Sequence, residues 1–228
     1  MGRGEYDGVA SALETLLDGS PTEREVQRFL RPYPYVVRNA LNAWAWNSIH
    51  LKPEFRFGGD YIADFLILSA HSGAWHTVLI EFESPTARPF TKNGNPSRAL
   101  AKGLAQLEEW NIWIKKNESG FRAKLSTLLK SRQTPAQCSN ASDHQLAHTE
   151  IRDPDTVINK EYVVVVGRRS SFFDSNSQER RGEHYARSQR IASYDRLLDQ
   201  AKILDPLRKR SSPGRSLRDF TSPWPVSA

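Results

Sequence analysis

This sequence of 228 residues is poor in cysteine and has no long apolar run. Its one cysteine, Cys138, cannot form a disulfide bond within the chain and indicates a reducing compartment. No run of about 18 apolar residues is present, which excludes a transmembrane helix. The first residues, MGRGEYDG, lack the apolar region of a secretory signal. We therefore expect a cytoplasmic protein that does not enter a membrane.

Hydrophobic residues make up 38% of the chain, which is low but sufficient for one folded core with polar insertions and tails. The net charge is +6, so a polyanion such as nucleic acid is a candidate partner. Arginine is concentrated in the C-terminal part, and its forked guanidinium suits phosphate. We expect DNA contacts from Arg168, Arg169, Arg180 and Arg181. A solvated surface followed by a disordered basic tail explains the same residues equally well.

The first part of the chain predicts an N-terminal arm or short helix over residues 1–19, followed by a helix with a clear start. In the segment SPTEREVQRFL, Ser20 can act as the N-cap and Glu23 can complete a capping box. Thr22 with Glu25 offers a competing box two residues further on.

Three extended segments follow, at 50–57, 61–68 and 75–83, each bounded by turn residues. An amphipathic helix is predicted over 97–117, with leucine and isoleucine along one face. The later segment KEYVVVVGRR contains an unbroken valine run, which is typical of a strand buried on both faces. The pattern of helix, three strands, helix, strand and helix predicts an α/β fold.

The rest of the second half divides into irregular and ordered parts. Residues 118–158 lose periodicity and gain polar residues, so we interpret them as a mobile insertion that could include a helical turn at 121–130. Helices are expected near 179–190 and across 194–204. From 206 to 228 the chain is rich in Pro, Ser and Arg, which predicts a disordered basic tail.

An acid stands inside an otherwise apolar strand, and two more acids end the next strand. If the two strands form a hairpin centred between Ser72 and Gly73, Asp64 lies directly opposite Glu81, with Cβ atoms about 5 Å apart. Strand side chains alternate between faces, so Glu83 lies on the same face as Glu81.

Three converging carboxylates are costly, because like charges repel and burial penalises each of them. Mg²⁺ would offset this cost, since it takes oxygen ligands and often uses one or two carboxylates together with substrate phosphates; Mn²⁺ could substitute. The other interpretation has Asp64 and Glu81 at solvent-exposed strand ends, or paired with Lys52 or Lys92.

An Asp in one strand followed by Glu-x-Lys or Glu-x-Glu in the next resembles the restriction-endonuclease-like superfamily. The surrounding blocks EREVQRFLRPYPYVV, ADFLIL, WHTVLIEFESP, ALAKGLAQLEEWNIWI, VVVVGRR and RIASYDRLL resemble the Shedu family of anti-phage nucleases. The resemblance covers about residues 20–205. It implies a restriction-endonuclease-like core with a mixed central sheet flanked by helices, and self-association into a homo-oligomer.

The resemblance also implies roles for single residues. Asp64 and Glu81 match the family's metal-binding acids, Glu23 matches the acid of the first helix, and Gln106 matches the glutamine of the helix after the acids. Glu83 departs from the pattern, because the family usually has lysine there.

A glutamate at position 83 could serve as a general base or as a third metal ligand. Lys102 lies one helical turn before Gln106, and its ammonium could replace the missing one. The other interpretation of Lys102 and Gln106 is that their side chains point into solvent.

These residues predict a Mg²⁺-dependent nuclease that cleaves DNA, in the bacterial phage-defence setting that the resemblance implies. The alternative is a catalytically inactive module that keeps the fold and binds nucleic acid or mediates assembly. The feature in favour of the alternative is the lysine that Glu83 replaces.

Overall fold

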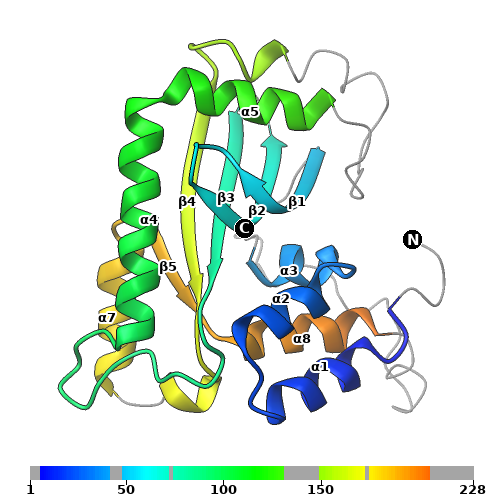
Figure 1. Cartoon of the computed structure of the whole chain (residues 1–228), viewed down its shortest axis with the longest axis vertical. Coiled ribbons are helices and arrows are strands. Elements are labelled where there is room, and N and C mark those ends of the chain that lie inside the picture. The colour runs from blue at the N-terminus through cyan, green and yellow to red at the C-terminus, as the bar shows by residue number, and fades with distance from the viewer. Residues whose placement is uncertain (1–5, 42–47, 72–73, 131–148, 173–174, 206–228) are drawn as a thin grey trace, which may run out of the picture.

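A five-stranded mixed sheet forms the centre of the computed structural model (Figure 1). The structure describes residues 6–41, 48–71, 74–130, 149–172 and 175–205. The strand order is β1-β2-β3-β4-β5; β1 to β3 are antiparallel, whereas β4 and β5 continue the sheet in parallel. The strands are β1 (Ser48–Arg56), β2 (Ile62–His71), β3 (Ala74–Phe82), β4 (Val157–Val165) and β5 (Gln189–Ala192).

Helices cover both faces of the sheet, which confirms the predicted α/β fold class with a mixed central sheet flanked by helices. One face carries α1 (Val9–Asp18), α2 (Glu23–Leu30), α3 (Pro34–Leu41) and α8 (Tyr194–Leu204). The other face carries α4 (Arg98–Lys116) and α5 (Glu118–Lys130). Beside β5 lie the short 3-10 helix η1 (Arg169–Phe172) and α7 (Ser175–Tyr185).

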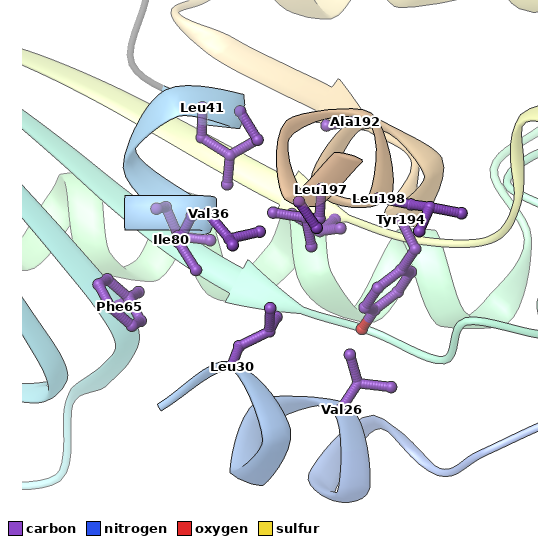
Figure 2. Close-up of a cluster of buried hydrophobic side chains, with 14 of the residues drawn as sticks. Val26, Leu30, Val36, Leu41, Phe65, Ile80, Ala192, Tyr194, Leu197 and Leu198 are labelled. Atoms are coloured by element: carbon purple, nitrogen blue, oxygen red, sulfur yellow. The ribbon is translucent and has the colours of Figure 1, made fainter. Parts of the chain in front are cut away.

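The alternation of strand side chains divides the core into two layers. Odd-numbered residues of β2, such as Phe65, point toward α2, α3 and α8, where Figure 2 shows Val26, Leu30 and Tyr194 gathered around the sheet. Even-numbered residues of β2, such as Leu66, point toward α4 and α5. Each fully buried aliphatic or aromatic side chain contributes roughly 1.5–3 kcal/mol, so these two layers hold the sheet in place.

The register predicted for the β2–β3 hairpin is confirmed. Phe65 pairs with Ile80 and His71 pairs with Ala74, which is the alignment that a turn centred on 72–73 requires. The valine run lies in β4, which pairs in parallel with β3 and β5 along its edges. It is buried on both faces because Val163 and Val165 pack into one helical layer and Val164 into the other.

The second helix starts two residues later than the Ser20 box predicts. Thr22 is the N-cap of α2: its side chain accepts a hydrogen bond from the backbone N–H of Glu25, whose carboxylate in turn accepts from the N–H of Thr22. Ser20 has a φ of 55°, outside the range that an N-cap needs, so the predicted Ser20–Glu23 box is wrong. Glu23 is thereby free of capping and can serve elsewhere.

Strand β5 and helix α3 were not expected, and helix α5 is longer than the helical turn that was expected at 121–130. The helix expected to reach residue 190 ends at Tyr185, because Gln189–Ala192 pairs with β4 as strand β5. Helix α5 occupies the start of the predicted insertion, where Phe121 and Leu125 are buried against the sheet. Residues 131–148 of that insertion, which include Cys138, and the tail 206–228 lie outside the described residues.

In the part of the chain that the structure describes, no helix combines the length and the apolar character needed to span a bilayer.

The capping geometry gives the first testable prediction. Thr22→Ala removes the side-chain acceptor at the start of α2, and we expect a loss of about 1 kcal/mol in the free energy of unfolding. Ser20→Ala is the matched control, because Ser20 caps nothing, and it should change stability by less than about 0.5 kcal/mol. Urea unfolding measures both values. A larger loss for Ser20→Ala than for Thr22→Ala would contradict this assignment.

Candidate active site

The structure brings together four of the acids that the sequence analysis singled out. Asp64 lies in β2, Glu81 lies near the end of β3, Glu83 directly follows β3, and Glu23 stands in the first turn of α2. Each of the other three acids raises the pKa of Glu81, so all four share one electrostatic environment. This group of Glu23, Asp64, Glu81 and Glu83 is called the acid site below.

The hairpin places Asp64 across from Glu81. Pairing of β2 with β3 extends to Phe65 and Ile80, and Asp64 continues it by a side-chain contact. Its Oδ2 accepts a hydrogen bond of 2.8 Å from the backbone N–H of Phe82. The bond fixes the carboxylate at the end of the ladder, on the face that α4 covers.

Glu81 carries the least compensated charge of the acid site. The residue is only 5% exposed. Its Oε2 atom has no hydrogen-bond partner among the described residues. A buried carboxylate oxygen without a partner is costly in free energy, and structures keep such groups where a ligand or ion completes them.

Glu83 has a cation of its own. Lys102 on α4 donates to Glu83 Oε1 over 2.9 Å, and the side chains of lysine and glutamate are 62% and 4% exposed, respectively. The hydrogen bond to Glu83 is the main reason why the pKa of Lys102 is raised, so this lysine remains protonated. Among the described residues, neither Lys52 nor Lys92 forms an ion pair with Asp64 or Glu81, and the lysine found at the site pairs with Glu83.

Two residues that the sequence analysis did not single out hold this arrangement. A Cβ atom on Gly103 would lie 3.1 Å from Glu83 Cγ and 3.0 Å from Val164 Cγ1, so the glycine lets α4 approach the sheet. The buried Tyr194 hydroxyl donates to the backbone carbonyl of Glu83 over 2.7 Å. The available signal for Gly103 was a glycine inside a long helical pattern; Tyr194 gave none.

Burial sets the protonation behaviour of the acid site. Desolvation is the largest cause that raises the pKa of Asp64, to about 7, although the hydrogen bond from Phe82 opposes it. Desolvation, followed by the charge of Asp64, raises the pKa of Glu81 to about 9. Burial and the charge of Glu83 raise the pKa of Glu23. The solvent-exposed alternative therefore does not describe these acids.

The donor atoms of the acid site suit Mg²⁺, which prefers oxygen ligands. Within the described ranges, no group of three or more His, Cys, Asp or Glu residues surrounds a single ion position. Glu83 is bound to Lys102, which leaves Asp64 and Glu81 as a pair of carboxylates. Two carboxylates are what Mg²⁺ commonly takes from a protein, and the unpartnered Oε2 of Glu81 offers one of the ligands.

The remaining residues of the predicted site are Gln106 and the four arginines. Gln106 is half-buried on α4, one turn after Lys102. Arg168 forms ion pairs with Asp18 and Asp195, at 3.0 and 3.1 Å.

The other three arginines predicted to contact DNA also have partners within the protein. Their partners are Asp199 for Arg169, Glu183 for Arg180 and the ring of Phe172 for Arg181. Their contact with DNA stays a prediction.

The raised pKa values give the second prediction. A carboxyl that keeps its proton in the folded state destabilises the fold increasingly as the pH rises above its unfolded pKa, which is 4.5 for Glu81. Glu81→Gln removes this cost, so we expect a gain of roughly 1–3 kcal/mol near pH 8 and a much smaller gain near pH 5. Thermal unfolding at both pH values measures it.

Glu109→Gln is the control for this prediction, because Glu109 is an exposed glutamate of α4. It should change stability little at either pH. An equal loss of stability for Glu81→Gln at both pH values would show that Glu81 is a needed structural acceptor instead.

Comparison with known proteins identifies a family for this chain. The family model described as Shedu protein SduA, C-terminal, matches residues 20–198. The match begins just before α2 and ends inside α8, so it includes Glu23, Asp64, Glu81, Glu83 and Lys102. A search of curated proteins gives no match. Because the family model covers most of the chain, the protein belongs to the family of the Shedu protein SduA C-terminal region.

Proposed function

We propose that this protein is a Mg²⁺-dependent nuclease that cleaves DNA phosphodiester bonds in anti-phage defence. The observation that carries the proposal is the pair of half-buried Asp64 and buried Glu81, in which Glu81 Oε2 lacks a partner among the described residues, in a chain of the Shedu family. A restriction-endonuclease-like arrangement of the hairpin acids is part of this proposal.

Asp64 and Glu81 would hold the metal ion, because they supply adjacent oxygen donors and neither forms an ion pair with a cation among the described residues. The raised pKa values mean that a bound cation would take the place of their protons. Bound there, Mg²⁺ would lower the pKa of a coordinated water and offset the charge that develops on the phosphate. The hydrogen bond from the N–H of Phe82 keeps Asp64 Oδ2 in place, so the second oxygen of this carboxylate is the one that remains for a ligand.

The Lys102–Glu83 pair would take the place of the lysine that the Glu-x-Lys motif supplies. Lys102 stays protonated and its side chain is largely exposed, so it can donate to a phosphate oxygen or orient water but cannot accept a proton. Glu83 is buried and aims the ammonium. Gln106, one turn further along α4, would contact the substrate next to it.

An open hollow of about 660 Å³ adjoins the acid site and offers a path for the DNA backbone. Its lining includes Lys102 and three further exposed cations, and no acid is among the residues that line it. These three cations are Arg88, Lys92 and Arg98. A row of cations beside a buried pair of acids is what a phosphate-bearing strand requires. Among the described residues, Arg88, Lys92 and Arg98 form no ion pair with a carboxylate, whereas Arg168 and Arg169 do.

The hollow gives the third prediction. Arg98→Ala should weaken binding to a short DNA duplex by roughly threefold to tenfold and reduce the salt dependence of the affinity by about one phosphate contact. Lys116→Ala, at the opposite end of α4, is the control and should bind like the natural protein. Fluorescence anisotropy at several salt concentrations measures both. Equal losses for the two variants would point to nonspecific attraction by net charge.

The fourth prediction tests the catalytic proposal. Purified protein should cut plasmid DNA with Mg²⁺ or Mn²⁺ and not with EDTA, and Glu81→Gln should lower the cleavage rate by at least about 100-fold, since a metal ligand is lost. Lys102→Met should lower the rate strongly as well, whereas Lys116→Met on the same helix should not. Gel electrophoresis of linear, nicked and single-stranded DNA gives the rates. Cleavage that is unchanged in Glu81→Gln would remove this residue from the site.

A second candidate function is a catalytically inactive module that binds nucleic acid or mediates assembly. It is favoured by one observation, which is that Glu83 stands at the lysine position and is bound to Lys102. Glu83→Lys separates the two functions. In a working site the change places two ammonium groups together and lowers the cleavage rate; in an inactive one it restores the usual motif and raises cleavage above zero.

A further inference from the structure

A second pocket, of about 350 Å³, is lined by residues of η1, α7, the end of β5 and α8. Three arginines line it, one from each of these helices: Arg169, Arg181 and Arg196. One acid, Asp199, is among the residues that line it, and it forms an ion pair with Arg169. The pocket therefore keeps two cations whose charge its own acid does not balance.

The geometry holds Arg181 ready for a ligand. Its guanidinium lies over the ring of Phe172, with 5.1 Å between Cζ and the ring centroid. Stacking on the ring occupies one face of the guanidinium and leaves its N–H edge free for hydrogen bonds. In the described part of the chain, no carboxylate forms an ion pair with Arg181, although Arg180 beside it is paired with Glu183.

The second cation is held close by a different contact. The Nε of Arg196 donates to the backbone carbonyl of Ala40 over 2.7 Å, which fixes the side chain between α8 and α3. Burial, together with the charge of Arg196, lowers the pKa of Arg181, so the two cations repel each other across the pocket. An anion between them would relieve that repulsion.

The pocket also supplies a hydroxyl. Ser193 is the N-cap of α8 but makes no side-chain capping hydrogen bond, so its hydroxyl can donate to a ligand. Two guanidinium groups and a hydroxyl around a cavity that is much larger than one water, which occupies about 30 Å³, match a tetrahedral oxyanion that carries a substituent.

We propose that this pocket, with Arg181 and Arg196 as its principal contacts, binds a phosphate group as a site separate from the acid site. The phosphate belongs to a small phosphate compound or to a polynucleotide strand, and both present the same oxygens to the arginines. The proposal does not depend on the nuclease function, because none of the residues that form the pocket belongs to the acid site.

The test is a thermal unfolding and calorimetric titration of the whole chain in EDTA, with three probes. These are inorganic phosphate, adenosine monophosphate and a short single-stranded DNA, each compared with chloride at equal ionic strength. We expect at least one probe to raise the melting temperature by a few degrees at about ten times its dissociation constant. Arg181→Gln should weaken that probe at least about tenfold. Arg152→Gln is the control, because Arg152 is an exposed arginine that does not line the pocket, and it should bind as the natural protein does.

The outcomes divide clearly. Binding of phosphate or the mononucleotide identifies a small phosphate compound, and binding of the DNA alone identifies a polynucleotide strand; either supports the site if Arg181→Gln removes it. No binding beyond chloride, or equal binding by Arg181→Gln and the natural protein, overturns the proposal.

Two further variants keep the test decisive. If circular dichroism shows that Arg181→Gln does not fold, Arg181→Lys replaces it, because lysine keeps the charge and loses the forked donor; undiminished binding by that variant overturns the proposal. Glu81→Gln should bind the phosphate probe as the natural protein does. Loss of binding in Glu81→Gln would place the anion at the acid site and overturn the proposal.

Discussion

The carboxylates of Asp64, Glu81 and Glu83 share one electrostatic environment in which Asp64 is half-buried and the two glutamates are buried, and the surrounding groups reduce the cost of this arrangement. The three acids differ in how they are stabilised. A backbone N–H serves Asp64, an ammonium serves Glu83, and the carboxylate of Glu81 keeps an oxygen without a partner. The oxygen of Glu81 therefore lacks a partner from the described protein, and either a proton or a bound cation would supply the missing interaction.

The topology explains why acids from so few strands can meet helices from both layers. The acids lie at the end of the β2–β3 ladder, where the parallel β4 is still adjacent to β3. Helix α2 brings Glu23 from one face, and α4 brings Lys102 from the other. The end of the ladder is thus the place where both layers contribute polar groups without disturbing the apolar core.

Pairing between neighbouring strands can be predicted from the sequence, whereas contacts between distant segments cannot. The hairpin could be predicted because a short turn fixes which residues pair, and this alone placed Asp64 opposite Glu81. The choice between the two capping boxes could not be predicted from the sequence. It depends on the backbone conformation after α1, where Ser20 has a positive φ. Likewise, the arginine-rich region reads as a phosphate surface, yet Arg168 meets Asp18 across the fold, a partner that no local pattern indicates.

The bond between the Tyr194 hydroxyl and the Glu83 carbonyl joins positions 111 residues apart, whereas the β2–β3 hairpin closes over a turn of a few residues. Contacts between distant segments cost more chain entropy when they form than local contacts do, so local contacts can form first. The hairpin can therefore align Asp64 with Glu81 while both remain hydrated and easily ionised. Their desolvation comes only when α4 and α8 dock. The electrostatic cost of the site thus falls on the final consolidation of the fold, and not on the search for its topology.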